Sequence, residues 1–376
     1  MRSGAAPRPH IPEVDSLRGL AALAVFGQHL LLPFWQPDNA VADWIHRIEV
    51  TPAFMFMAGH EAVVWFFLLS GFVLSLPHVR GERVDAWPFL IRRLCRIYLP
   101  YLASLAVALA CASVWNGRPV AEFSDWFNHV WATAPSWRDI AAHIVFIGRY
   151  DVDSINPALW SLVYELRVSL LFPWLVVFWM ARGVQANLTW ALICVVVGTI
   201  AGRFLSAEAE TLSVIGTFGV GFLLAKHRHE LVEWYRSQPV ARRGLIAATG
   251  VGLYTIAPHL PVLLFHFRVI PITAGALLLT VVALGSPLAG RFLGLGPVRF
   301  LGRVSYSFYL YHAIVIIAVL HAGYGRVPVG VLLVATAFIT TALAWVSYAF
   351  VERPGIALGR RLTAGAARPA RTMDAT

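Results

Sequence analysis

Long apolar runs recur along the chain, separated by short polar segments. A helix needs about 20 mostly apolar residues to cross a bilayer, and somewhat fewer where neighbouring helices bury it. Lipid leaves unpaired backbone groups unsatisfied, so runs of this length predict helices. The candidate spans are residues 17–34, 57–76, 97–115, 158–180, 188–204, 212–224, 245–256, 269–284, 305–320 and 327–351. The pattern therefore predicts an all-α fold, a polytopic transmembrane bundle of about ten helices.

Ten spans place both termini on one side of the membrane, and the basic residues indicate which side. Of the 30 Lys and Arg residues, 22 fall in the termini and loops of that side, and six fall in the opposite loops. Cytoplasmic loops collect Lys and Arg, so both termini are predicted to be cytoplasmic. We expect a cytoplasmic N-terminal segment at 1–16, a transmembrane domain at 17–356, and a disordered cytoplasmic tail at 357–376.

Composition agrees with this assignment. The 376 residues are 58% hydrophobic and only 13% charged, whereas soluble domains average about a quarter charged residues. Three cysteines exclude a disulfide scaffold. The net charge of +10 is the kind of excess that binds nucleic acid. In a membrane chain the distribution of Lys and Arg already explains it, so no nucleic-acid partner is expected.

Arg18 and His29 are ionisable residues in the first span, where such side chains usually face a cavity or a partner. Eleven residues separate them, which corresponds to a rise of about 16 Å and nearly the same helix face. They are expected to line one wall, with the arginine at the cytoplasmic mouth and the histidine deep inside. A structural, hydrogen-bonded histidine is the alternative. Asp15, one turn before Arg18, either anchors the arginine or begins the helix.

Three arginines stand at the cytoplasmic start of the third span. Arg92 and Arg96 are four residues apart and Arg93 and Arg96 three, so the three guanidinium groups are predicted to converge on one anion. Arginine fits phosphate in a bidentate manner. Ordinary enrichment of cytoplasmic loops in positive charge is the alternative explanation.

The fourth span contains Trp160, Ser161, Tyr164 and Glu165. Ser161 and Glu165 share one helix face, and Trp160 and Tyr164 share a neighbouring face. The carboxylate then lies inside the membrane, as a functional group or as the structural partner of an arginine.

The ninth span contains a further polar group. Tyr306, Tyr309 and His312 are predicted to follow one face of this helix. Packed tyrosines with satisfied hydroxyl groups are the alternative reading.

Several motifs are absent from the sequence: a Walker loop, a dinucleotide-binding glycine motif, a His-Glu-x-x-His zinc motif, cysteine pairs with zinc spacing and a nucleophile elbow. A nucleotide-driven pump is not supported, and no metal site or permanently bound cofactor is expected.

Six short motifs occur in an order that resembles one known family. They are Arg18 with ten residues before His29, the run Phe66 to Phe72, Arg93-x-x-Arg96 before Tyr98-Leu99-Pro100, Trp160 to Glu165, Ser305 to His312, and Val351 to Pro354. Together they resemble the acyltransferase family 3 integral membrane proteins, over residues 11 to 356. The chain departs from the pattern after Glu165, where Leu166 to Ser169 replaces a common polar pair and Phe-Tyr.

The resemblance implies an acyl-CoA donor, by default acetyl-CoA, bound from the cytoplasm, and a carbohydrate-containing acceptor whose hydroxyl is acylated on the outer side. It implies that His29 is catalytic, and that Arg93 and Arg96 serve donor binding. It also implies a multi-pass protein of the bacterial inner membrane. The departure after Glu165 bears on the class of acceptor.

The residues then suggest a chemical scheme. Arg18, Arg92, Arg93 and Arg96 are expected to hold the donor's phosphates, and neutral His29 to accept the proton of the acceptor hydroxyl. Glu165 is expected to orient His29 or hold the acceptor, and Ser161 and Tyr309 are candidates for stabilising the oxyanion. Trp160, His312 and Asp15 are supporting candidates. The competing hypotheses are a proton-coupled secondary transporter and a glycan exporter.

Overall fold

The computed structural model describes residues 11–36, 39–145 and 151–364, and the regular structure within these ranges is helical, with no strand. Its helices are α1 (Pro12–Leu31), α2 (Ala40–Glu49), α3 (Gly59–Val79), α4 (Ala86–Trp115), α5 (Asp125–His129), α6 (Trp137–Val145), α7 (Trp160–Met180), α8 (Val184–Phe204), α9 (Thr211–Ser237), α10 (Val240–Thr255), α11 (Val262–Phe265), α12 (Val269–Gly285), α13 (Pro287–Leu293), α14 (Gly296–Gly323), α15 (Val329–Ser347) and α16 (Arg353–Leu362). Short 3-10 or π turns join them at Leu32–Phe34, Pro52–Phe56, Val152–Ser154, Ala207–Glu210, Ala257–His259 and Tyr348–Glu352. The all-α prediction is confirmed for this part of the chain.

The predicted count of ten spans is not confirmed. Among the described residues, eight helices are long and apolar enough to cross a membrane, and nine if α12 and α13 count as one span bent by 91°. The predicted span 245–256 corresponds to α10, which has 16 residues and falls short. The bend between α12 and α13 has a local cause, because the Ser286 side chain caps α13 and Pro287 occupies its first turn.

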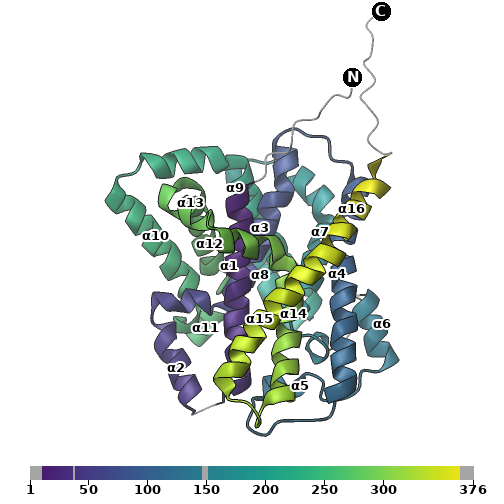
Figure 1. The fold of residues 1–376 in the computed structure, drawn as a ribbon. Helices are drawn as coiled ribbons and strands as arrows, with labels where there is room; N and C mark the ends of the chain where they lie inside the picture. Colours follow the sequence, from purple (N-terminus) through teal and green to yellow (C-terminus); the bar gives the residue numbers. More distant parts are fainter. Residues whose placement is uncertain (1–10, 37–38, 146–150, 365–376) are drawn as a thin grey trace, which may run out of the picture.

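The domain boundaries stay a prediction. Helix α1 begins at Pro12, before the expected start of the membrane domain, and helical structure continues to Leu362. The start of α1 and the end of α16 lie at the same end of the bundle (Figure 1). Most of the predicted N-terminal segment and tail, residues 1–10 and 365–376, lies outside the described residues.

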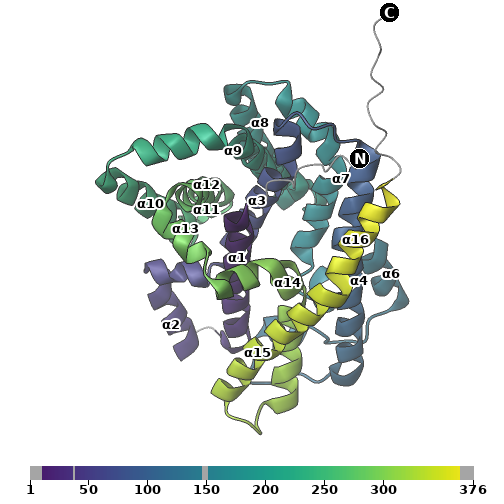
Figure 2. The same ribbon diagram turned by 45° about the horizontal axis from the view of Figure 1, so that its top comes forward.

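Helix α1 occupies the middle of the bundle, packed against α3 on one side and α14 on the other. Figure 2 shows α10, α12 and α13 gathered on one side of this centre, and α4, α7 and α16 on the other. Many small side chains of α1, including Ala21, Ala22 and Ala24, are buried in this packing. The polar residues of α1 therefore face protein on several sides, which is the environment a membrane site needs.

Two glycines let α1 and α14 approach backbone to backbone. A methyl group at Gly19 would come within 2.5 Å of the backbone nitrogen of Gly302, and one at Gly302 within 2.6 Å of the carbonyl oxygen of Asp15. The two helices run parallel, since Phe26 meets Phe308 further along, with ring centroids 5.5 Å apart. This contact fixes their relative register.

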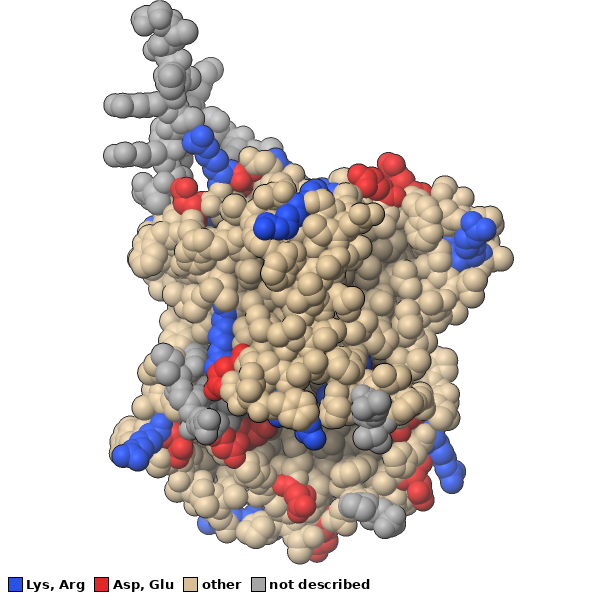
Figure 3. Space-filling model, turned by 180° about the vertical axis from the view of Figure 1, so that it is seen from behind, with Lys and Arg blue, Asp and Glu red and all other residues tan. Residues whose placement is uncertain are grey.

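The outer surface carries large apolar side chains on the helices that flank the bundle. Trp174 and Val177 of α7 and Phe338 of α15 are more than 60% exposed. On the face seen in Figure 3, a band of uncharged surface separates charged side chains at the upper end from those lower down. Such a band is typical of a lipid-facing surface.

Candidate functional site

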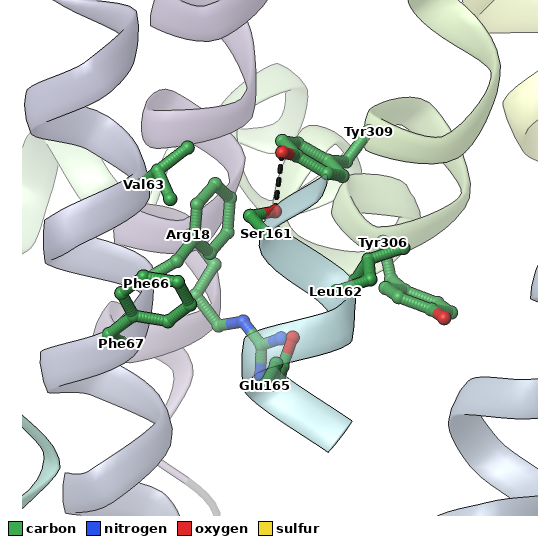
Figure 4. Close-up of a pocket in the computed structure, with 9 residues that line it drawn as sticks. All are labelled: Arg18, Val63, Phe66, Phe67, Ser161, Leu162, Glu165, Tyr306 and Tyr309. Carbon is green, nitrogen blue, oxygen red and sulfur yellow. Dashed lines mark hydrogen bonds between the residues drawn. The ribbon is translucent and has the colours of Figure 1, made fainter. Parts of the chain in front are cut away.

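A cavity opens between α1, α3, α7 and α14, and Arg18 forms part of its wall. The cavity is small, about 20 Å³, and the lining residues are Arg18, Val63, Phe66, Phe67, Ser161, Leu162, Glu165, Tyr306 and Tyr309. In Figure 4 the guanidinium of Arg18 points toward Glu165. The Ser161 and Tyr309 hydroxyl oxygens lie 2.7 Å apart, so one donates to the other. Three separate predicted groups thus meet around one cavity.

Glu165 is held by a buried ion pair. Arg93 Nη2 donates to Glu165 Oε1 at 2.5 Å, and the two side chains are 8% and 12% exposed. Arg93 Nε donates to Ser169 Oγ at 3.0 Å, and Ser70 Oγ donates to Glu165 Oε1 at 3.1 Å. The network joins α3, α4 and α7, and it satisfies much of the charge on both ions.

The three arginines of α4 do not converge as predicted. Arg93 points inward to Glu165, while Arg92 Nε donates to Thr363 Oγ1 at 2.7 Å, just beyond the end of α16. Successive residues on a helix point about 100° apart, so neighbouring Arg92 and Arg93 reach different elements. Helix α16 approaches closely here, because a methyl group at Gly359 would lie 3.0 Å from Arg92 Cα.

Arg18, Arg92 and Arg96 have no ion pair within 4 Å among the described residues, and Arg92 is hydrogen-bonded to Thr363. Arg18 is 8% exposed and its Nε has no hydrogen-bond partner. Arg96 is half-buried and lies close enough to Glu165 and Glu352 to interact with both electrostatically. Glu352 accepts a hydrogen bond from Ser307 at 2.8 Å. Arg18, Arg93 and Arg96 share the electrostatic field of Glu165 and Glu352, and Asp15 also acts on Arg18.

His29 lies beyond the cavity, toward the other end of α1. Its Nδ1 is 2.7 Å from Nε2 of His312, a fully buried residue of α14. Trp126 of α5 stacks on its ring at 5.3 Å, with 30° between the planes. His312 Nδ1 in turn lies 2.7 Å from the carbonyl oxygen of Tyr309, which lines the cavity. Tyr309 thus connects the two groups of residues.

The predicted role of Glu165 in orienting His29 does not match these contacts. The hydrogen bonds of Glu165 run to Ser70 and Arg93, whereas His29 is bonded to His312. The sequence placed His29 and Glu165 on separate helices, but it held no information on how α1 and α7 face each other.

The other predicted supporting residues lie nearby. Asp15 is half-buried, and its carbonyl oxygen abuts Gly302. Trp160 and His60 have parallel rings 6.4 Å apart, at an angle of 7°. Both line a second cavity, which shares Val63 and Phe67 with the first.

Three contributors were missed by the sequence analysis. Ser169 lies four residues after Glu165, so helical periodicity could have found it. Ser70 lies within the run Phe66 to Phe72, which contributed to the family resemblance but was not assigned a role. Trp126 comes from a loop helix, and no local pattern links it to His29.

Comparison with known proteins adds an independent observation. A family model described as an acyltransferase domain matches residues 11–349. The O-acetyltransferase OatA of Staphylococcus aureus is 23% identical over 92% of this chain and 57% of its own length. Nodulation protein 10 of Rhizobium leguminosarum is 26% identical over 94% and 96%, and the acyltransferase MdmB of Streptomyces mycarofaciens 27% over 81% and 79%. The chain thus spans little more than half the length of OatA, and no solved structure matches.

Proposed function

Because the chain belongs to the acyltransferase family whose domain model matches residues 11–349, we propose that it is a multi-pass membrane O-acyltransferase. The acyl donor is acyl-CoA, by default acetyl-CoA, and the acceptor is a hydroxyl of a carbohydrate-containing molecule. The name of OatA supports acetyl transfer to oxygen. The protein resides in a bacterial inner membrane, with the end of the bundle that carries Arg92 and Arg96 facing the cytoplasm. The excess of Lys and Arg at that end supports this orientation.

One observation carries the proposal: α1 bears a buried arginine at a cavity and, eleven residues on, a hydrogen-bonded histidine. The rise between them is about 16 Å. Coenzyme A has phosphates at one end and a thioester at the other end of a slender arm of comparable reach. Phosphates held at the arginines therefore bring the thioester toward His29.

The arginines that are not held in a close ion pair are the candidates for binding the phosphates. Arg93 is already paired with Glu165, so we assign the phosphates to Arg18 and Arg96, with Arg92 at the margin. Arg93 and Glu165 then hold α4 and α7 in the geometry that keeps Arg96 near Arg18.

The transfer step needs one base. The acceptor oxygen attacks the thioester carbonyl carbon while its proton passes to neutral His29; the new C–O bond forms and the C–S bond breaks. The proton on His29 then passes to the leaving thiolate, which departs as the free thiol of coenzyme A. General-base catalysis of this type contributes about 10²–10⁴-fold to the rate.

The test uses the full chain purified in detergent, with acetyl-CoA binding measured by calorimetry and slow acetyl-CoA hydrolysis by thiol release. His29→Ala is expected to bind the donor as the wild type does and to lose about 10²–10⁴-fold in turnover. Arg96→Ala is expected to weaken binding by about tenfold or more, the loss of a charge-assisted hydrogen bond.

Two exposed residues supply matched controls. His46→Ala and Arg326→Ala, both on exposed side chains, are expected to change neither binding nor hydrolysis. Folded wild-type protein that binds no acyl-CoA of any chain length would refute the proposal, and would favour a proton-coupled transporter instead.

A further inference from the structure

The contact between His29 and His312 has the geometry of an in-plane hydrogen bond. The two ring centroids are 5.0 Å apart, the planes differ by 11°, and Nδ1 of His29 lies 2.7 Å from Nε2 of His312. The rings are nearly parallel, their nitrogens are close and their centroids are far apart. The rings therefore lie edge to edge in nearly one plane, and they are not stacked face to face. The lone pair of an imidazole nitrogen lies in the ring plane, so it points along this contact.

The next contact along the chain of bonds fixes where the protons are. His312 Nδ1 lies 2.7 Å from the Tyr309 carbonyl oxygen. A carbonyl oxygen only accepts, so His312 Nδ1 carries a hydrogen. His312 is fully buried, and none of its hydrogen-bond partners in the described structure is a carboxylate. Its neutral form is therefore favoured.

Neutral His312 with a hydrogen on Nδ1 leaves Nε2 as an acceptor. His29 must then donate from Nδ1, and the lone pair of neutral His29 is on Nε2. The tautomer of His29 is thus set by two hydrogen bonds that run from the backbone of Tyr309 through His312.

Helix register explains why the two histidines meet. Gly19 and Gly302 are in backbone contact, and α1 and α14 run parallel from that point. His29 comes ten residues after Gly19, and His312 ten residues after Gly302. The equal spacing carries both rings about 15 Å from the glycine contact, so a rigid pair of helices places them at one depth.

We propose that His312 is the positioning residue for His29: it accepts the Nδ1 hydrogen of His29, holds Nε2 free as the base, and stabilises the charge when Nε2 takes the acceptor's proton. The inference rests on the proposed function, and it gives His312 the role that sequence reasoning offered to Glu165. Trp126 covers one face of the His29 ring and limits its rotation. In this arrangement His312 holds the base His29 in one tautomer, as the third member of a catalytic triad does.

Two substitutions of His312 separate hydrogen bonding from packing. A glutamine side chain would keep an acceptor oxygen near the place of Nε2, whereas a leucine side chain removes the acceptor. His312→Gln is expected to retain turnover within about tenfold, and His312→Leu to lose about 100-fold or more in kcat with the acetyl-CoA Kd unchanged. His321→Leu, on the same helix, is the matched control and is expected to keep wild-type turnover.

A spectroscopic readout tests the tautomer without any turnover. Histidine labelled with nitrogen-15 in the full chain is expected to show His29 with hydrogen on Nδ1 and a bare Nε2, with the signal assigned by its loss in His29→Ala. In His312→Leu this preference is expected to disappear. Thermal unfolding and a donor Kd like those of the wild type would show that His312→Leu is folded. If His312→Leu does not fold, the wild-type spectrum and the turnover of His312→Gln test the positioning role.

The outcomes separate the inference from the proposed function. Wild-type His29 with hydrogen on Nε2, or a folded His312→Leu with unchanged kcat, would overturn the positioning role. Full turnover by His29→Ala would instead overturn the base assignment in the proposed function, whatever the tautomer spectrum shows.

Discussion

Replacing Gly302 with alanine is expected to disturb a site about 15 Å away. The new methyl group would come within 2.6 Å of the Asp15 carbonyl oxygen, and ordinary contacts begin at 3.4 Å. The two backbones must therefore separate by about 0.8 Å. The atoms nearest to the new methyl group belong to the backbone of Asp15 and Ser16, so no flexible side chain can move aside. Helices α1 and α14 must therefore shift as units.

The separation of α1 from α14 also moves His29 away from His312. If the helices separate rigidly, the distance between His29 Nδ1 and His312 Nε2 grows from 2.7 Å to about 3.5 Å, beyond the usual hydrogen-bond range. Misplacement on this scale can cost about 10²-fold in rate. Overpacking of this kind also destabilises by about 1–3 kcal/mol.

The assay pairs thermal unfolding in detergent with acetyl-CoA hydrolysis. Gly302→Ala is expected to lower the apparent Tm and the turnover rate. Gly252→Ala in α10 is the matched control, because a methyl group there meets nothing within 4 Å; alanine in a helix is favoured over glycine by about 0.5–1 kcal/mol. Equal Tm and equal turnover for the two variants would refute the register argument.

Two further predictions concern packing away from the histidines. Removing either partner of the buried pair Arg93–Glu165 is expected to destabilise by about 3–5 kcal/mol, because the other charge stays buried, and the double variant to lose less than the sum; additive losses in thermal unfolding would contradict this. Trp65 Nε1 donates to Thr280 Oγ1 at 2.9 Å in a buried contact between α3 and α12, and neither residue lines the cavity. Trp65→Phe is expected to cost about 1 kcal/mol of stability and to leave acetyl-CoA hydrolysis unchanged, so a selective loss of turnover would argue against a purely structural role.

Much of the fold was readable from the sequence because lipid imposes helices on long apolar runs. The runs at 17–34 and 57–76 correspond to α1 and α3, each with its ends within a few residues of prediction. The prediction from hydropathy fails where local capping residues end a helix within an apolar run, or where the helix is too short. Ser286 and Pro287 end one helix and begin another, and α10 is shorter than a crossing needs.

The candidate site was predictable only within single helices. The spacing of Arg18 and His29 along α1 follows from helix geometry, and so does the shared face of Ser161 and Glu165. Periodicity relates residues three or four apart, and it carries no information on which helix a face meets.

Tertiary structure decided the pairings across helices. It turned Arg93 toward Glu165 and Arg92 toward Thr363, and it joined His29 to His312. The physical reason is backbone packing: glycines at positions 19 and 302 let two helices touch, and the contact sets the register that brings distant residues together. The sequence by itself thus determined which polar side chains lie in the apolar helices and how far apart they are along each helix, and only the packing of the helices decided which of them meet.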